Sequence, residues 1–231
     1  MRMLAMIPAR GGSKRVPRKN IKNFLGKPII AYSIIAARES GLFDDVMVST
    51  DDAEIAQVAR EYGASVPFMR SAATSDDFAT TRDVLEEVLR DYSSRGQEFD
   101  YMCCIYPTAP FVTPEKLQKV FNLMVEKNAD DASPLVRYSY PPQRAFYIRD
   151  DVKTPCHPEM MPMRSQDLEP IFHDAGQFYF YKLESFFGKK ENYYSLPVEF
   201  PESEVQDIDN LEDWTIAELK YDLMVKRLGK G

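Results

Sequence analysis

Short apolar runs alternate with amphipathic segments along most of this chain of 231 residues. The first run, MLAMI at residues 3–7, predicts a buried strand. Residues 28–41 then read PIIAYSIIAARESG, with apolar side chains at helical spacing. Pro28 suits the first turn of a helix, and Gly41 suits the position just past its end. The pattern therefore predicts a strand followed by a helix.

The same alternation continues downstream. Further strands are predicted at residues 45–50, 101–106, 132–137, 177–181 and near 195–200. Further helices are predicted at residues 51–63, at 80–96, from Pro114 onward with Thr113 as its N-cap, and from about Asn210 to Leu228. Parallel strands need crossover connections, so this order predicts an α/β fold: a Rossmann-like, mostly parallel sheet with helices on both faces.

The alternation stops between Tyr138 and Pro170, where the chain is rich in Pro, Met and Arg. We interpret residues 138–170 as an excursion over the sheet, within a single domain that spans residues 1–231. Such an excursion is expected to cover a ligand or a partner subunit.

Charge is distributed unevenly. Nine Lys or Arg and no Asp or Glu lie in residues 1–38, although the whole chain has a net charge of −7. A nucleic-acid-binding protein would more often be basic overall, so the composition favours a small anionic ligand and no nucleic acid. The three cysteines have no C-x-x-C spacing, which argues against a zinc site or a disulfide framework. With no signal peptide or membrane-spanning segment apparent, we expect a cytoplasmic protein without a membrane partner.

The basic stretch, residues 7–20 (IPARGGSKRVPRKN), follows the first predicted strand directly. In open α/β sheets, ligands bind at the carboxyl ends of the strands, and this loop is usually central to the site. Two glycines allow close approach of the backbone to an anion. The charge for a polyphosphate would come from Arg10, Lys14, Arg15, Arg18 and Lys19. The stretch matches neither the Walker loop nor the dinucleotide fingerprint, and a solvated basic loop is the alternative.

A second polar element, QDIDN, lies at residues 206–210. In an extended segment the side chains of Asp207 and Asp209 point the same way, so both can face one hard cation, with Mg²⁺ as the obvious candidate. The alternative is that one of them caps the helix that begins near Leu211.

Residues 7–34, IPARGGSKRVPRKNIKNFLGKPIIAYSI, resemble the N-terminal signature of the cytidylyltransferases that activate nine-carbon sugar acids, the CMP-sialic acid synthetase family. VSTDDAEIAQVAREYGA, YPTAPF and VQDIDNLEDW follow in the family's order, so the resemblance covers nearly the whole chain. It implies a nucleotide-diphospho-sugar transferase fold. Within the family, RSQDLEPIFHDAGQFYFY is most similar to the enzymes that act on pseudaminic acid; sialic acid and legionaminic acid are the alternative substrates.

The implied reaction is attack of a sugar hydroxyl on the α-phosphate of CTP, with release of pyrophosphate. It calls for positioning and charge neutralisation rather than a protein nucleophile. Arg10 and Lys19 are the candidates for stabilising the phosphates, assisted by Ser13 and the backbone amides of Gly11 and Gly12. The resemblance extends the nucleotide site to Ala9, Lys14, Asn20, Arg70, Asp77, Thr80 and Thr81. It also raises the Mg²⁺ interpretation of Asp207 and Asp209 above the capping alternative.

Sugar recognition is predicted for residues in and after the excursion: Arg164, Gln166, His173, Gln177, Tyr179, Tyr193 and Tyr194. Gln177 and Tyr179 lie two apart on one predicted strand, so an amide and a phenol would face the same side and could read acetamido groups. The family pairs through its excursion, and a neighbouring subunit's aromatic side chains can close the sugar pocket. The resemblance therefore implies a homodimer.

Several of these residues have structural alternatives. Thr80 could cap the helix that follows it, alone or together with a ligand role. His173 could be an ordinary structural histidine. Tyr106 stands where sialic acid enzymes commonly have a Gln, which leaves base recognition open at that point. A nucleic-acid-binding module leaves QDIDN unexplained, and a catalytically silent nucleotide sensor is disfavoured by retention of both the cations and the paired aspartates.

Overall fold

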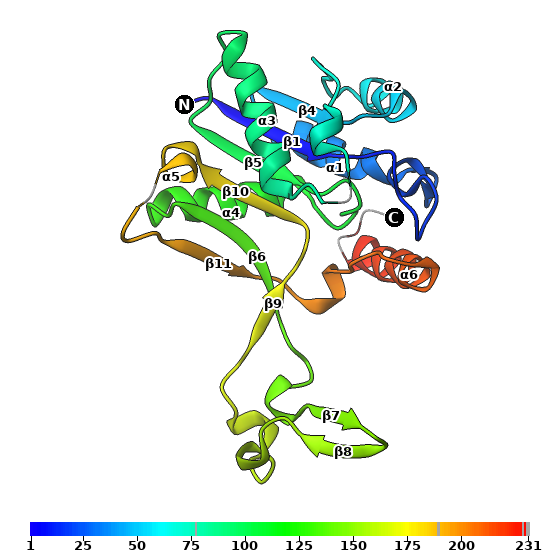
Figure 1. The fold of residues 1–231 in the computed structure, drawn as a ribbon, viewed down its shortest axis with the longest axis vertical. Helices are drawn as coiled ribbons and strands as arrows, with labels where there is room; N and C mark the ends of the chain where they lie inside the picture. Colours follow the sequence, from blue (N-terminus) through cyan, green and yellow to red (C-terminus); the bar gives the residue numbers. More distant parts are fainter. Residues whose placement is uncertain (77, 189, 228, 230–231) are drawn as a thin grey trace.

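A seven-stranded sheet forms the centre of the computed structural model, which describes residues 1–76, 78–188, 190–227 and 229 (Figure 1). The sheet has the order β11-β6-β10-β5-β1-β4, and β9 pairs with β6. Its strands are β1 Met3–Pro8, β4 Asp45–Ser49, β5 Tyr101–Ile105, β6 Asp131–Arg137, β9 Phe172–Asp174, β10 Phe178–Lys182 and β11 Ser195–Glu199. Two short ribbons lie outside it: β2 Asn23–Phe24 with β3 Lys27–Pro28, and β7 Phe146–Arg149 with β8 Val152–Pro155.

The predicted, mostly parallel sheet is confirmed. β1 runs parallel to β4 and β5, and β11 runs parallel to β6. β10 is antiparallel to both β5 and β6, and β9 is antiparallel to β6. The alternation of apolar and polar residues identified β10 as a strand but carried no information on its direction, because either direction buries the same side chains.

Helices cover both faces of the sheet, as predicted. The helices on the sheet are α1 Ile29–Glu39, α2 Ala53–Glu61, α3 Thr81–Ser94, α4 Pro114–Glu126 and α5 Leu183–Phe187, and a further helix, α6 Leu211–Arg227, packs beside the start of α1. The side chain of Thr113 caps α4, as its sequence predicted. The short helix α5 was not predicted. None of the described helices has the length and apolar character that crossing a bilayer requires.

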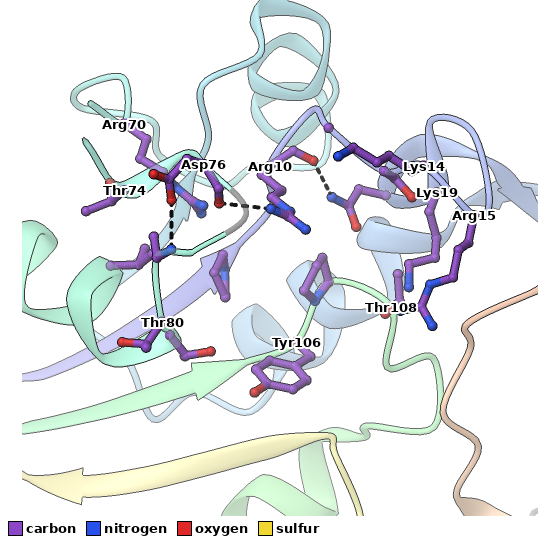
Figure 2. A pocket seen from close by; sticks show the side chains of 18 of the residues that line it. Arg10, Lys14, Arg15, Lys19, Arg70, Thr74, Asp76, Thr80, Tyr106 and Thr108 are labelled. Carbon is purple, nitrogen blue, oxygen red and sulfur yellow. Dashed lines mark hydrogen bonds between the residues drawn. The ribbon is translucent and has the colours of Figure 1, made fainter. Parts of the chain in front are cut away.

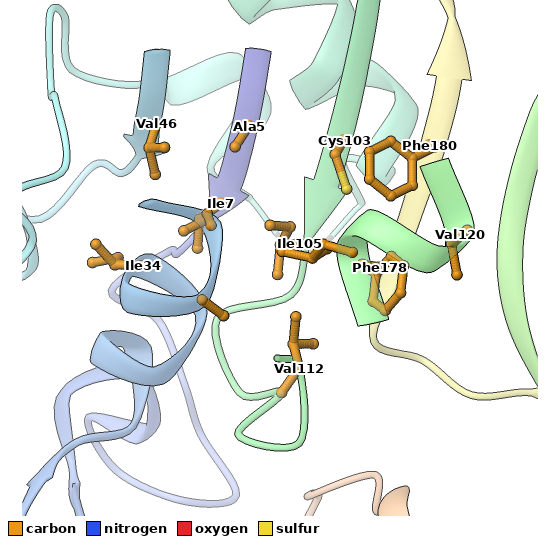
Figure 3. Close-up of a cluster of buried hydrophobic side chains, with 14 of the residues drawn as sticks. Ala5, Ile7, Ile34, Val46, Cys103, Ile105, Val112, Val120, Phe178 and Phe180 are labelled. Carbon is orange, nitrogen blue, oxygen red and sulfur yellow. The ribbon is translucent and has the colours of Figure 1, made fainter. Parts of the chain in front are cut away.

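The strands bury side chains on alternate faces. Ala5 and Ile7 of β1 pack with α1, α2 and α4 in one cluster (Figure 3). Leu4 and Met6 pack with α3 and α5 in another. The adjacent cysteines of β5 also face opposite sides: Cys103 packs in the first cluster and Cys104 in the second. A third cluster joins α6 to the start of α1 and to Val16 of the basic stretch. The basic stretch is therefore fixed to the core through the buried side chain of Val16.

Residues 138–171, which we call the arm, do not lie over the sheet as expected. Figure 1 shows them projecting away from it, with the β7–β8 hairpin toward the far end. The reason is that β9 continues antiparallel to the end of β6, pairing Arg137 with Phe172, so the two strands form a stalk that leaves the sheet. The arm exposes large apolar side chains, including Tyr140 (88% exposed) and Ile148 (78%).

Candidate functional site

A cavity of about 680 Å³ opens at the carboxyl ends of β1 and β5 (Figure 2). Its wall is strongly basic, with two carboxylate residues, Asp76 and Asp207, among the described lining residues. The cations that line it are Arg10, Lys14, Arg15, Lys19 and Arg70. An excess of positive charge in a concave, partly desolvated space attracts an anion of several charges. This basic cavity lies at the end of the first strand, where the sequence predicted the ligand.

The basic stretch curves around one side of this cavity. The Arg10 guanidinium donates to the carbonyl of Asp76 at 2.9 Å, and the Asn20 amide donates to the carbonyl of Arg10 at the same distance. The Ser13 hydroxyl donates to the Val16 carbonyl at 2.6 Å. The bond from Asn20 to Arg10 ties the two ends of the stretch together. Gly12, Ser13, Lys14 and Asn20 all line the cavity with the two candidate catalytic cations.

Three residues of the basic stretch that were predicted to contact the nucleotide do not face the cavity. Ala9, near the start of the stretch, is fully buried. The amide of Gly11 donates to the Asp51 carboxylate at 2.9 Å, so it points at protein rather than into the cavity. Arg18 does not line the cavity either, because its guanidinium pairs with Asp52 and Glu54 on the other side. Asp77, also predicted to contact the nucleotide, lies outside the described residues.

Arg70 brings a buried charge to the opposite wall. The residue is 8% exposed, and its guanidinium donates to the Ser49 hydroxyl at 3.1 Å and to the Ser49 carbonyl at 2.7 Å. Burial lowers the pKa of Arg70, opposed by the more distant charges of Asp51 and Glu87. None of the described carboxylates forms an ion pair with it. A buried cation held only by neutral oxygens is stabilised by an incoming anion.

Thr80 combines the two roles that the sequence left open. Its hydroxyl accepts from the amide of Asp83, and the Asp83 carboxylate accepts from the amide of Thr80, which is a complete capping box for α3. Thr80 and Thr81 also line the cavity. The amino end of α3 therefore points toward the ligand space, and its dipole favours negative charge there.

Lys19 lies beside the acidic element. Its ammonium donates to the carbonyl of Ile208 at 2.6 Å and lies 3.9 Å from Asp209. Asp209 also accepts from Arg15 at 2.7 Å. Burial lowers the pKa of Lys19, and Asp209 and Asp207 oppose that shift. Both predicted metal ligands are thus close to cations of the basic stretch.

The helix-capping alternative for Asp207 and Asp209 is wrong. The cap of α6 is Asn210, whose side-chain oxygen accepts from the amides of Glu212 (2.8 Å) and Asp213 (3.0 Å). Asp213 completes the motif by accepting from the amide of Asn210. Ile208 is buried between the two aspartates, so they face away from the core as alternation predicted.

The donor set can be tested against a metal ion. The described residues contain no cluster of three or more His, Cys, Asp or Glu positioned to share one. Asp207 and Asp209 can supply two carboxylates, which suits Mg²⁺, an ion that is commonly held by one or two carboxylates plus phosphate oxygens and water. Asp207 and Asp209 therefore suit a cation that binds together with a nucleotide. The two carboxylates alone do not complete the coordination of a metal ion.

The predicted sugar contacts divide into separate places. The Tyr179 hydroxyl donates to Asp174 at 2.7 Å, and its ring centroid lies 5.4 Å from that of Tyr106, which lines the cavity. Gln177 does not line the cavity. It precedes the first residue of β10, is 2% exposed, and donates to the carbonyl of Glu204 at 2.8 Å.

The other predicted sugar contacts do not line this cavity. Arg164 and Gln166 are on the exposed arm, where Arg164 pairs with Asp167 at 2.7 Å. His173 lies in the stalk, with its ring 4.8 Å from that of Tyr138. Tyr193 and Tyr194 precede β11 at the amino ends of the parallel strands, opposite the cavity, and the Tyr193 hydroxyl donates to Asp131 at 2.8 Å.

Asp51 and Asp52 were not assigned a role from the sequence, although both contact the basic stretch. The signal was their position: they follow β4, the parallel neighbour of β1, so the two loops meet at the same edge. Asp76 and Thr108 were also missed. They lie in irregular segments, where periodicity gives no information on direction.

Comparison with known proteins gives a consistent result. The sequence profile of the cytidylyltransferase family matches residues 4–227. The chain is 40% identical to a pseudaminic acid cytidylyltransferase of Campylobacter jejuni subsp. jejuni, over 96% of this chain and 97% of that protein. It is 34% identical to a CMP-N,N'-diacetyllegionaminic acid synthase of Legionella pneumophila subsp. pneumophila, over the same shares of the two chains.

A solved structure supports the fold. A CMP:2-keto-3-deoxy-manno-octonic acid synthetase complexed with CTP superimposes with a TM-score of 0.68 at 18% identity, covering 98% of this chain and 100% of that one. At this level of identity the likeness concerns the fold alone.

Proposed function

Because this chain belongs to the cytidylyltransferase family, we propose that it transfers CMP from CTP to the anomeric hydroxyl of a nine-carbon sugar acid, with pseudaminic acid as the substrate. The observation that carries the proposal is the basic cavity, where Arg10, Lys19 and Arg70 converge at the carboxyl end of β1. The choice of sugar rests on similarity to the pseudaminic acid enzyme over nearly the whole of both chains.

In the reaction, the sugar oxygen forms a bond to the α-phosphorus of CTP while the bond from that phosphorus to the β-phosphate oxygen breaks. The proton of the attacking hydroxyl passes to water, and pyrophosphate leaves with the charge that develops on the β-phosphate oxygen. Arg10, Lys14 and Lys19 border the cavity from the basic stretch, and Arg70 borders it from the opposite wall (Figure 2). Fixed cations that surround the phosphates lower the barrier by stabilising charge where it develops.

Lys19 must exchange partners for this role. Its ammonium donates to the Ile208 carbonyl, so contact with a phosphate replaces that neutral acceptor by an anionic one. Charge-assisted hydrogen bonds are roughly twice as strong as neutral ones, which favours the exchange.

We further propose Mg²⁺ as the cofactor, held by Asp207 and Asp209 together with phosphate oxygens. When bound, it supplies additional charge neutralisation at the phosphates. The proposal is supported by the cap of α6, which Asn210 provides, so neither aspartate is needed for capping. Arg15 holds Asp209 in place in the absence of the ion.

The arm supports the proposal of a homodimer. The arm exposes Tyr140, Tyr147 and Ile148 by more than half, so it has an apolar surface that the described part of the chain does not cover. A second copy of the chain would cover it, and would bring Arg164, Gln166 or the Tyr193–Tyr194 pair toward a neighbouring cavity. Light scattering should give twice the chain mass of 26.6 kDa. A fully active monomer would contradict this proposal.

We place the reaction in the cytoplasm, a compartment in which cysteines stay reduced. Support comes from Cys103, Cys104 and Cys156, all free thiols in the described structure.

The test is incubation with CTP, Mg²⁺ and a panel of nine-carbon acids while pyrophosphate release is followed. We expect fastest turnover with pseudaminic acid. Faster turnover with legionaminic or sialic acid would reassign the sugar, and no turnover with any of them would refute the activity. CTP binding without turnover would indicate a nucleotide sensor.

A further inference from the structure

We propose that Arg18 and Asp52 are positioning residues for cytidylyl transfer, because their ion pair holds the basic stretch in the shape that presents Arg10 and Lys19 to the cavity. This inference rests on the proposed function. Neither residue lines the cavity, so neither is offered as a contact to CTP or sugar.

The first observation is the backbone at Arg18. This residue has φ 55° and ψ 31°, in the left-handed region that non-glycine residues rarely adopt. The next residue is Lys19, the first of a short 3-10 helix that ends at Ile21. The sharp reversal at Arg18 therefore fixes the direction in which Lys19 leaves the chain. Such a conformation persists only where the surroundings determine it strongly.

The surroundings are the loop and helix after β4. The two terminal nitrogens of Arg18 donate to the two oxygens of Asp52, at 2.5 and 3.0 Å, and one of them also contacts Glu54. A two-point contact with a planar guanidinium fixes orientation as well as distance. The hydrogen bond from Arg18 is the main reason that the pKa of Asp52 lies near 2.

Asp52 is itself held rigidly. It is the N-cap of α2, and one carboxylate oxygen accepts from the amides of Glu54 and Ile55 at 3.0 Å each. The position of Arg18 is thereby tied to a helix packed on the sheet rather than to another mobile side chain.

The same loop holds the other end of the basic stretch. Asp51 accepts the amide of Gly11 at 2.9 Å. A Cβ atom on Gly11 would lie 2.8 Å from a carboxylate oxygen of Asp52, so close contact at this point requires glycine. Adjacent aspartates therefore clamp the stretch at two points on the side facing away from the ligand.

The test compares Arg18→Ala, Asp52→Asn and the double variant with wild type. Asp52→Asn keeps an oxygen for capping α2 but removes the charge that Arg18 binds. Glu86→Gln is the matched control, because it breaks an exposed Arg82–Glu86 pair of 2.8 Å on α3, outside the cavity lining.

Limited trypsin digestion without ligand should cut after Lys14 and Arg15 at least threefold faster in the Arg18 and Asp52 variants than in wild type or control. Calorimetry should show CTP affinity about tenfold weaker. In turnover, kcat should fall and KM for CTP should rise, while KM for the sugar stays within twofold. The double variant should be no worse than the poorer single variant, since the pair acts as one unit.

Unchanged digestion together with CTP affinity within twofold of wild type would overturn the inference. So would equal increases in both KM values with a lower melting temperature, which indicate general destabilisation. If wild type proves inactive on every sugar, the proposed function fails, but digestion and CTP binding still decide the role of the ion pair.

Discussion

The ammonium of Lys19 donates a 2.6 Å hydrogen bond to the backbone carbonyl of Ile208, which joins the basic stretch to the acidic element 189 residues later. Asp207 and Asp209 flank that carbonyl in the chain. The contact brings the candidate phosphate-binding residues next to the candidate metal ligands. The two groups come from separate parts of the sequence. Under the proposed function, both groups would act on the same triphosphate.

Asp209→Asn should lower turnover by ~100-fold, the scale typical of removing one stabilising group, and Asp207→Asn should behave similarly. The melting temperature should hardly change, because Asn210 caps α6. Turnover measured over a Mg²⁺ titration checks the prediction.

The matched variant is Asn210→Ala, which should cost about 1 kcal/mol of unfolding free energy through loss of the cap, with no change in Mg²⁺ dependence. Near-normal turnover of Asp209→Asn at limiting Mg²⁺ would contradict the metal assignment.

Arg70→Met should weaken CTP affinity by about tenfold or more, since hydrogen bonds to charged groups contribute ~1.5–3 kcal/mol. It should not lower the melting temperature, because it removes a buried charge, and the Ser49 carbonyl keeps its bond from the amide of Ala9. Calorimetry and thermal unfolding test the two parts. Unfolding at a clearly lower temperature with unchanged CTP affinity would make Arg70 a structural residue.

Tyr179→Phe should raise KM for the sugar more than KM for CTP. The lost hydroxyl donates to Asp174, and the ring of Tyr179 lies beside that of Tyr106, which lines the cavity. Gln177→Ala should instead destabilise the protein by ~1–3 kcal/mol, since it leaves the Glu204 carbonyl without its donor. The sequence predicted a sugar role for both residues. A selective sugar defect in Gln177→Ala, at wild-type stability, would restore that interpretation.

Gly11→Ala should open the basic stretch in the ligand-free protein, because the new Cβ would meet Asp52 at 2.8 Å. Gly12→Ala is its control, because none of the described residues has an atom within 4 Å of a Cβ at that position. Hydrogen exchange of residues 10–20 without nucleotide is the readout. Equal exchange in the two variants would show that the contact at Gly11 does not matter.

Asp130 gives a prediction for pH. Burial alone would raise its pKa, but hydrogen bonds from Lys190, Ser185 and the amide of Tyr194 outweigh burial and lower the pKa to about 2. The folded pKa lies below the ordinary value of 3.8, so this contribution is present above about pH 4 and lost as pH falls toward 2. Thermal unfolding scans should show a melting temperature that falls by several degrees over that interval.

In Asp130→Asn this part of the acid dependence should be missing, and the melting temperature at neutral pH should be lower. Parallel pH curves for the two proteins would show that Asp130 titrates normally.

Local patterns in the sequence predicted the features that are determined by residues close together in the chain. Thr113 and Pro114 marked the start of α4, and the position of the basic stretch after the first strand located the cavity. Contacts between distant segments could not be predicted that way. Arg18 counted as one more phosphate-binding cation, because nothing near it in the chain shows that Asp52, 34 residues later, takes its charge. Asn210 was likewise overlooked as a cap beside two more conspicuous aspartates.

The arm was recognised as a break in the pattern, but its direction depends on pairing between β6 and β9, at Arg137 and Phe172. A three-residue strand such as β9 is too short for periodicity to identify.

That pairing also makes the arm convenient for protein engineering. Its two ends meet on adjacent strands, so residues 138–171 can be exchanged as an insert without altering the path of the chain around the basic stretch. Libraries confined to this insert would vary the surface that we propose for dimerisation and leave every residue that lines the cavity unchanged.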